Sequence, residues 1–168
     1  APPLLAGALV FGLSLPTDAL TWAAFATAVV LGYTVSFGLR YLLALAGSRC
    51  TASAVFGLLQ QGLVARRFGL DAEGLARVHA WLQDAGVHWA LDAGHRASFG
   101  LPGQPAHSFA DGLDRLFLGY ALPARVDAPF DARLPAGDAE GSDAIALGAL
   151  WRFVGQLAAL QRRVAAPL

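Results

Sequence analysis

The longest stretch without a formal charge constrains the fold of this chain more than any other feature. Residues 19–39 (ALTWAAFATAVVLGYTVSFGL) contain no Asp, Glu, Lys or Arg. As a helix rising about 1.5 Å per residue they would span about 30 Å, the thickness of the hydrocarbon core of a bilayer. The stretch therefore predicts either a membrane-spanning helix or a helix buried in a protein core.

The flanks of this stretch favour the membrane span over the buried helix. Arg40 and Arg49 follow it, which by the positive-inside tendency would place its C-terminal end in the cytoplasm. A shorter apolar run over residues 2–15 precedes it, and Thr17 or Asp18 can cap the helix that follows. A secretory signal peptide is the weakest alternative, because no basic segment precedes the first apolar run.

Charge divides the chain into two parts. Residues 1–50 hold only three charged side chains, whereas residues 51–168 hold ten arginines and eleven acidic residues. We therefore expect an apolar segment over 1–50, a junction over 51–63 and an ordinary soluble sequence over 64–168. The net charge of the whole chain is zero, so any contact with DNA would need a local cluster of arginines or a partner subunit. The single cysteine excludes an intrachain disulfide.

Capping residues predict three helices, joined by loops rich in Pro and Gly, in the C-terminal part. Asp71 can cap the first helix, and Gly86 can end it. Ser108 can cap the second helix, which Pro123 ends, and Ser142 can cap the third. The sequence therefore predicts a mainly α fold, with apolar N-terminal helices followed by a loop-rich three-helix segment.

Helical periodicity predicts which side chains these three helices bury. The second helix is also expected to carry an ion pair between Asp111 and Arg115, which are four residues apart. The inward-facing residues expected are Leu75, Val78, Trp81 and Leu82 in the first helix, Phe109, Leu113, Leu116, Phe117 and Tyr120 in the second, and Ile145, Leu150, Val154, Leu157 and Leu160 in the third.

Motifs for common chemistry do not occur in the sequence. There is no GxxxxGK[ST] phosphate loop, no GxGxxG fingerprint, no GxSxG nucleophile elbow and no HExxH metal motif. His88, Asp92 and His95 have a spacing at which a helix would gather metal ligands, but Gly86 and Gly94 flank them and favour a loop. We expect no catalytic site, no cofactor and no metal site in this chain.

Two kinds of residue are candidates for contact with nucleic acid. Arg66 and Arg67 form an adjacent basic pair, and so do Arg162 and Arg163; either pair can contact phosphate, although two arginines are a weak signal. Trp81, Trp89 and Trp151 are able to stack on bases, but tryptophans at these spacings are more often anchors of a core.

Five ordered motifs give the C-terminal part a resemblance to a known family. The segments are ARRFGLD (65–71), WLQDAGVHWALD (81–92), HR with GLP (95–102), GLDRLFLGYA (112–121), and LP with EGSD (134–143). In this order and spacing, from about residue 64 to the end, they resemble the RecC family, the gamma chain of exodeoxyribonuclease V. The residues that carry the resemblance, for which we expect structural roles, are Trp89, Asp92, Arg96, Gly112, Asp114, Arg115, Gly119 and Tyr120.

A few positions depart from the family pattern. His88 stands where Arg is usual, Ala90 where Gly is usual, and Leu122 where Met is usual. His107-Ser-Phe109 replaces Asn-Thr-Trp. These changes put the local geometry of turns in question more than the resemblance itself.

The resemblance implies a subunit of a RecBCD-type helicase–nuclease, which processes DNA double-strand ends for recombinational repair. It implies a cytoplasmic location, with DNA and RecB-like and RecD-like subunits as partners. The gamma chain has the layout of a helicase but is not the motor; it splits the duplex, channels the strands and takes part in recognising the regulatory sequence. The chain would then be a fragment of a helicase-like subunit, with a scaffold or DNA-handling role.

The N-terminal part supports a different reading. Residues 1–60 or so loosely resemble an integral membrane permease of an ABC transporter. The resemblance lies in Gly12–Pro16, in the long apolar stretch and in Val35–Ala44. This alternative implies an inner-membrane protein anchored through residues 19–39, or a fusion of the two.

Overall fold

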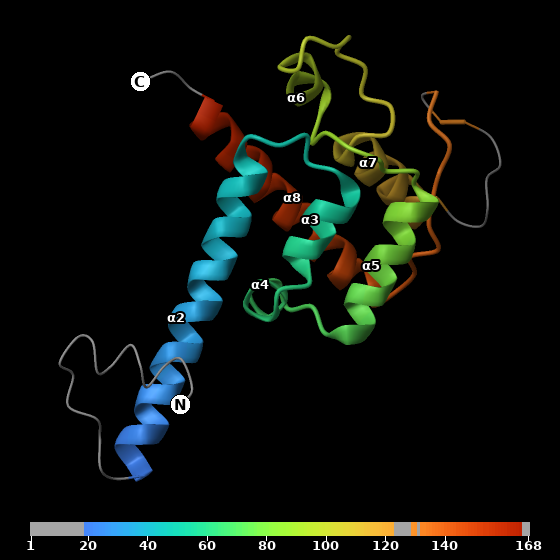
Figure 1. The fold of residues 1–168 in the computed structure, drawn as a ribbon. Coiled ribbons are helices and arrows are strands. Elements are labelled where there is room, and N and C mark those ends of the chain that lie inside the picture. Colours follow the sequence, from blue (N-terminus) through green and yellow to red (C-terminus); the bar gives the residue numbers. More distant parts are fainter. Residues whose placement is uncertain (1–18, 123–128, 131, 166–168) are drawn as a thin grey trace. The chain divides into compact units, whose positions relative to one another are not determined.

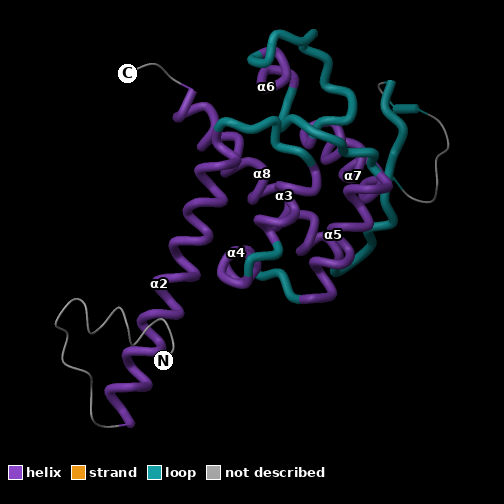
Figure 2. The backbone as a smooth tube through the Cα atoms, viewed as in Figure 1, coloured by secondary structure: helices purple, strands orange, loops and turns teal. Residues whose placement is uncertain are grey.

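The computed structural model describes residues 19–122, 129–130 and 132–165. The described residues are mainly helical and contain no strand, as Figure 2 shows, which confirms the mainly α prediction. The helices are α2 (Ala19–Ala46), α3 (Ala52–Leu59), α4 (Gly62–Phe68), α5 (Ala72–Asp84), α6 (Ala93–Ala97), α7 (Phe109–Ala121) and α8 (Asp143–Ala165) (Figure 1).

The chain forms two compact units, residues 1–40 and residues 41–168. The charge-free stretch lies in α2 and is helical throughout, as its composition indicates. The run over residues 2–15 and the proposed caps Thr17 and Asp18 lie outside the described residues.

Two described helical stretches are apolar, and they differ in length. Asp143–Val164 is long and apolar enough to cross a membrane, whereas the apolar stretch Ala23–Tyr33 is shorter. The longer one forms most of α8, whose inner face is buried in the core of the second unit. Its apolar composition is therefore explained by packing within that core.

In the second unit, α8 is the helix around which the others pack. It contacts α4, α5 and α7, and Figure 1 shows it running behind α3. The buried face of α5 is formed by Val78, Trp81 and Leu82, as predicted. The other buried side chains that join this core include Leu58 and Leu59 of α3, Phe68 of α4, Phe109, Leu113 and Leu116 of α7, and Leu147, Leu150, Phe153, Val154 and Leu157 of α8.

Local capping signals predict the helix boundaries well. The Asp71 carboxylate accepts a hydrogen bond from the Gly74 amide at 2.8 Å at the start of α5. Ser108 accepts one from the Asp111 amide at 3.3 Å at the start of α7. Gly86 follows α5 with a φ of 62°, a left-handed conformation that glycine adopts without a steric penalty. The α7 helix ends at Ala121, and Pro123 lies outside the described residues.

Four of the predicted inward-facing residues are exposed instead. In α7, Phe117 and Tyr120 are exposed, because the inner stripe runs through Leu116 and continues with Gly119. In α8 the exposed residues are Ile145, at 71% of its full surface, and Leu160. The buried arc of α8 is instead completed by Leu147, Ala149 and Phe153, because the helix packs against three neighbours rather than one.

The segment before α5 is also more ordered than composition indicates. It contains α3, capped by Thr51, whose hydroxyl accepts from the Ala54 amide at 3.3 Å, and α4, which ends at Gly69. The ARRFGLD motif therefore spans the end of one helix and the cap of the next. With α6 as well, the C-terminal part holds more helices than the three predicted.

Candidate functional site

The ring of the motif residue Trp89 contacts two arginines. The guanidinium carbon of Arg96 lies 4.8 Å from the centre of the Trp89 ring, and that of Arg49 lies 5.9 Å from it. Backbone hydrogen bonds fix the segment, since Ala90 donates to the Arg49 carbonyl at 3.1 Å and Ala52 donates to the His88 carbonyl at 2.9 Å. The tryptophan is half-buried, and Arg49, Arg96 and Phe99 all contact its ring, so its ring makes contacts within the chain.

The next motif residues organise the loop that contains α6. Asp92 accepts a hydrogen bond from the His95 amide at 2.7 Å and caps this short helix. Arg96 donates to the Ala106 carbonyl at 2.8 Å, and its Nε is buried without a hydrogen-bond partner. These hydrogen bonds of Asp92 and Arg96 both lie within the segment from residue 92 to residue 106.

The spacing of His88, Asp92 and His95 does not produce a metal site. His88 packs against His107, with ring centres 5.0 Å apart, while the Nδ1 of His95 accepts a hydrogen bond from the Leu91 amide at 3.2 Å. Within the part of the chain that the structure describes, no group of three or more His, Cys, Asp or Glu is placed to hold a metal ion.

Two glycines of the motif GLDRLFLGYA lie where α7 touches other backbone or side chains most closely. A Cβ atom at Gly112 would overlap the Cγ2 methyl group of Val87. A Cβ atom at Gly119 would overlap the carbonyl oxygen of Ala136. Both positions therefore need glycine because of packing rather than backbone conformation.

The charged residues of the same motif make contacts within the chain. Arg115 donates to the carbonyl oxygens of Leu134 and Ala85, both at 2.8 Å. It therefore does not form the predicted ion pair with Asp111, because its guanidinium is engaged by these carbonyls. Asp114 lies 3.4 Å from Arg133, and Tyr120 is exposed.

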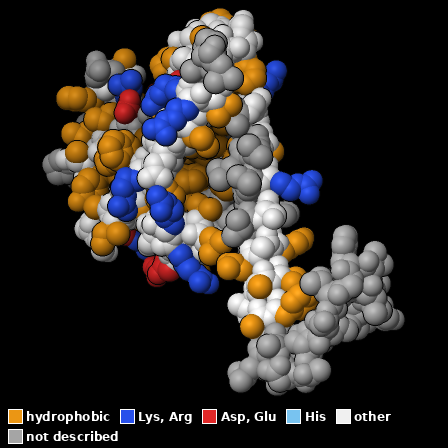
Figure 3. Space-filling model, turned by 90° about the vertical axis from the view of Figure 1, so that its left-hand side faces the viewer, with side chains coloured by type: hydrophobic (Ala, Val, Ile, Leu, Met, Phe, Trp, Pro, Cys, Tyr) orange, Lys and Arg blue, Asp and Glu red, His pale blue; other side chains and the backbone are white. Residues whose placement is uncertain are grey.

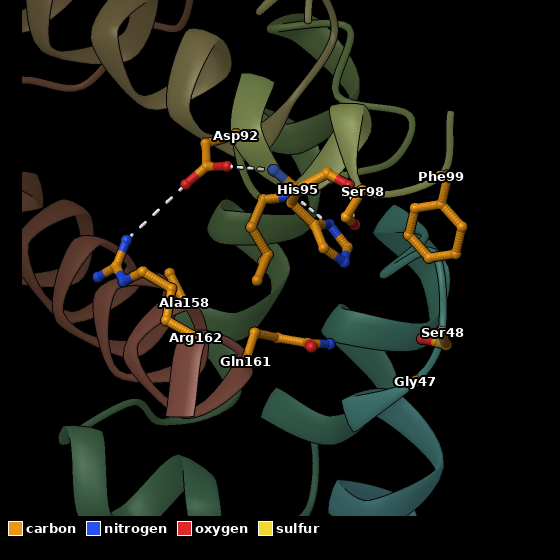
Figure 4. A pocket seen from close by; sticks show the side chains of 11 residues that line it. Gly47, Ser48, Asp92, His95, Ser98, Phe99, Ala158, Gln161 and Arg162 are labelled. Carbon is orange, nitrogen blue, oxygen red and sulfur yellow. Dashed lines mark hydrogen bonds and ion pairs between the residues drawn. The ribbon is translucent and has the colours of Figure 1, made fainter. Parts of the chain in front are cut away.

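A pocket of about 390 Å³ opens beside the α6 loop. One wall is formed by His95, Ser98 and Phe99, and another by Gln161 and Arg162 of α8 (Figure 4). The remaining lining residues are Gly47, Ser48, Leu91, Asp92, Gly94 and Ala158. An ion pair of 3.9 Å between Asp92 and Arg162 joins the loop to α8 at the edge of the pocket.

The polar groups around this pocket are mostly engaged with each other. Gln161 donates to the Leu45 carbonyl at 2.7 Å and to the Cys50 sulfur at 3.4 Å. The Ser98 hydroxyl donates to the His95 carbonyl at 2.7 Å. Burial lowers the pKa of His95, with the negative charge of Asp92 opposing this effect.

Neither candidate nucleophile near this pocket is activated. Ser98 points its hydroxyl at a carbonyl, so His95 does not act on it as a base. Cys50 is fully buried, and burial raises the pKa of its thiol, so the reactive thiolate is disfavoured. Among the described residues, this pocket therefore brings together no nucleophile–base pair.

The tryptophans differ in their surroundings. Trp81 is buried in the core, as predicted for an anchor, whereas Trp89 is half-buried outside the core cluster and Trp151 is 58% exposed. Trp151 follows Leu150 directly, so the helical turn places it about 100° away from the inner face of α8. The prediction that Trp151 anchors the core is therefore wrong.

The basic pair Arg66 and Arg67 lies exposed in the last turn of α4. Beside it a groove of about 250 Å³ runs between α4 and α8. Arg163, from the second basic pair, is exposed on α8 as well, and so is Arg152, which the sequence did not single out. The sequence signal that could have indicated these arginines as a basic surface is the absence of acidic residues from α4 and from α8 after Asp143.

Comparisons with known proteins agree on one family. Residues 34–168 match the model of the RecBCD enzyme subunit RecC fourth domain. RecC of Mycobacterium tuberculosis is 33% identical over 117 residues, which is 69% of this chain and 11% of that protein. RecC of Escherichia coli K12 is 31% identical over 124 residues, which is 74% of this chain and 11% of that protein.

These matches also bear on the N-terminal part. The chain spans about a tenth of the length of these relatives, at 11% in each case. The family match begins at residue 34, inside α2 and upstream of residue 64, where the quoted motifs begin. Neither the family match nor the relatives support the permease resemblance of residues 1–60.

Proposed function

This chain belongs to the RecC family, and we propose that it forms a helical scaffold of a RecC-type subunit that handles DNA without catalysing a reaction itself. The subunit would act in the cytoplasm as part of a RecBCD-like helicase–nuclease in recombinational repair. Its partners would be RecB-like and RecD-like subunits and DNA.

One observation supports a scaffold role more than any other. The two glycines of the α7 motif let this helix contact Val87 and the backbone of Ala136 without steric overlap. Arg115, between them in sequence, donates to the carbonyl oxygens of Ala85, which precedes α7, and of Leu134, which follows it. Three of the residues that carry the family resemblance, Gly112, Arg115 and Gly119, are thus engaged in joining the end of α5, α7 and the segment that follows α7.

The membrane alternative is not part of this proposal. Residues 34–39 belong both to the charge-free stretch and to the RecC match, so the match overlaps the predicted span. We also propose that the helical domain extends from about residue 34 to residue 168, the bounds of the family match.

A segment exchange tests the proposed function. The 117 matching residues of M. tuberculosis RecC are replaced by those of this chain, and the hybrid is produced with RecB and RecD of that organism. We expect the three subunits to co-purify and to degrade linear duplex DNA in the presence of ATP. A matched hybrid carrying Gly119→Val should fail to assemble. If the unaltered hybrid is soluble but does not assemble, the scaffold role is wrong.

A further inference from the structure

We propose that the face formed by α4 and α8 binds single-stranded DNA, with arginines on the phosphates and a base in the groove between the helices. This inference rests on the proposed function and specifies which surface of the chain would contact DNA. Four arginines define the face, Arg66 and Arg67 of α4 and Arg152 and Arg163 of α8.

Charge is segregated between the helices of the second unit. The α3 and α4 helices and the part of α8 after Asp143 contain five arginines and no acidic residue. Acidic residues lie instead on α5 and α7, at the start of α6 and in the segment before α8. A chain with no net charge therefore presents one basic face, which would attract a polyanion locally.

The four arginines of this face are not used within the fold. The ion pairs between described residues engage Arg77, Arg133 and Arg162. Among the described residues, no acidic side chain lies within ion-pair distance of the four arginines, and all four are exposed. Their guanidinium groups are therefore free to bind phosphates.

Helix polarity explains only part of this distribution. Arginines are favoured in the last turn of a helix because its carbonyl end is partially negative, and three of the four arginines lie in last turns. Arg152 lies near the middle of α8, where this effect has decayed, so it needs another reason.

The spacing along α8 suits an extended strand. Arg152, Gln156 and Arg163 fall within about 40° of one another around the helix axis at about 100° per residue. The two arginines are about 16 Å apart along the helix at about 1.5 Å per residue. An extended single strand would place two or three phosphates over that length.

The groove beside this stripe has the character of a base-binding site. Its lining is apolar except for Arg67 and Gln156, and its other lining residues are Leu58, Val64, Phe68, Phe153, Leu157 and Leu160. Phe68 and Phe153 pack edge to face, with ring centres 5.3 Å apart, and both are largely buried, so aliphatic side chains form most of the surface open to a base. Figure 3 shows basic side chains beside apolar ones on a face with few acidic side chains.

The size of the groove favours a base over a partner helix. A volume of about 250 Å³ holds one or two flat rings. A docked amphipathic helix would instead need pockets for anchors over two turns. The Gln156 amide in the lining supplies both a donor and an acceptor, as base edges require. A groove lined by arginines that tracks the phosphates is a feature of sites for single strands.

The test measures the binding of the full chain to a fluorescent oligothymidylate of about 20 nucleotides, by anisotropy at a series of salt concentrations. Each arginine that contacts a phosphate contributes about 0.7 to the slope of log affinity against log salt, so four predict a slope of about −3. We expect the double variant Arg152→Ala/Arg163→Ala to reduce the magnitude of this slope by about 1.4. We also expect it to lower the affinity for the oligonucleotide about tenfold at low salt.

A control variant distinguishes the effect of arginines on this face from the effect of net charge on binding. Arg40→Ala/Arg133→Ala removes the same charge elsewhere and should keep the slope of the wild-type chain. If Arg152→Ala/Arg163→Ala binds as the wild type does, the proposal is wrong. A working segment exchange together with that result would reject the surface and leave the scaffold role standing.

Two further probes distinguish DNA from an acidic protein partner. An abasic oligonucleotide of equal charge should bind more weakly than oligothymidylate, and Leu160→Glu should remove that difference by placing a negative charge at the groove. Polyglutamate that binds as tightly as oligothymidylate, with the same sensitivity to Arg152→Ala/Arg163→Ala, would overturn the proposal in favour of an acidic protein segment.

Discussion

The indole nitrogen of Trp81 donates a hydrogen bond to the carboxylate of Asp138 at 3.0 Å, across 57 residues of sequence. The Asp84 carboxylate, on the same helix as Trp81, accepts a hydrogen bond from the Gly137 amide at 2.6 Å. Together these bonds fasten the segment before α8 to α5. A loop rich in Pro and Gly is thereby held against the core.

Trp81→Phe should therefore loosen this attachment as well as the core. We expect the free energy of unfolding to fall by about 2 kcal/mol, from the lost hydrogen bond and the smaller ring. Asp138→Ala should cost about 1 kcal/mol, because only the hydrogen bond is lost. Urea titration of both variants and of the double variant measures this. An additive loss in the double variant would contradict a direct interaction.

Gly119→Ala should destabilise the chain because its new methyl group would meet the Ala136 carbonyl oxygen. The backbone at Ala136 or in α7 must move to relieve the overlap. We expect a loss of about 2–3 kcal/mol in the free energy of unfolding. Gly148→Ala in α8 is the matched control, since nothing lies within 4 Å of its Cβ position. That change should stabilise the helix by about 0.5–1 kcal/mol. Equal effects of the two substitutions would refute the packing argument.

The parts of the fold that follow from local sequence were predictable. The caps Asp71 and Ser108 act on amides three residues away, so the sequence alone places the starts of α5 and α7. The sequence of α3, ASAVFGLL, contains no charge pattern, and so short a helix is stabilised chiefly by docking on its neighbours. Apart from the cap Thr51, nothing local indicates this helix.

The parts that depend on distant contacts were not predictable. Three neighbouring helices define the inner face of α8, and the periodicity of α8 alone does not reveal their positions. For this reason Ile145 and Trp151 were expected to be buried, whereas both are exposed. The pocket beside α6 combines residues 47–48, 91–99 and 158–162, which no spacing rule connects. The motif glycines were noticed, but their contacts with Val87 and Ala136 appear only in the folded chain.

The contact between Gly112 and Val87 gives a prediction with a rescue. Gly112→Ala should lower the free energy of unfolding by about 1–3 kcal/mol, because its methyl group overlaps a Val87 methyl group. Val87→Ala alone should cost about 1–2 kcal/mol through a small cavity. The double variant should be more stable than the sum of the two losses predicts, since one methyl group replaces the other. Additive losses, measured by urea titration, would show that the two residues do not compete for space.

The pKa of His95 predicts how stability depends on pH. Burial lowers this pKa below 6.5, so the unfolded chain binds a proton more readily than the folded chain as the pH falls. The contribution of His95 to stability is therefore present above pH 6.5 and is lost as the pH falls through the lowered folded-state value. Protonation at Nδ1 would also remove the acceptor for the Leu91 amide.

His95→Gln tests this dependence, because the amide can accept the same bond but does not titrate. Urea midpoints are compared at about pH 7.5 and about pH 5.5, on either side of the ordinary histidine pKa. We expect the wild-type midpoint to drop more than that of the variant as the pH is lowered. If both midpoints fall equally, other groups account for the pH dependence.

Cys50 should react slowly with thiol reagents in the folded chain. It is fully buried with a φ of 49°, and burial raises the pKa of its thiol despite the hydrogen bonds from Gln161 and Ser48.

Gln161 also donates to the Leu45 carbonyl, so Gln161→Ala would leave that buried carbonyl without this donor and open a space beside the sulfur. We expect faster labelling by a disulfide reagent in Gln161→Ala than in the wild type under native conditions, and equal rates in denaturant. The exposed neighbour Arg162→Ala is the control and should leave the native labelling rate unchanged. Equal protection in the Gln161 and Arg162 variants would mean that the core alone, and not the glutamine, shields the thiol.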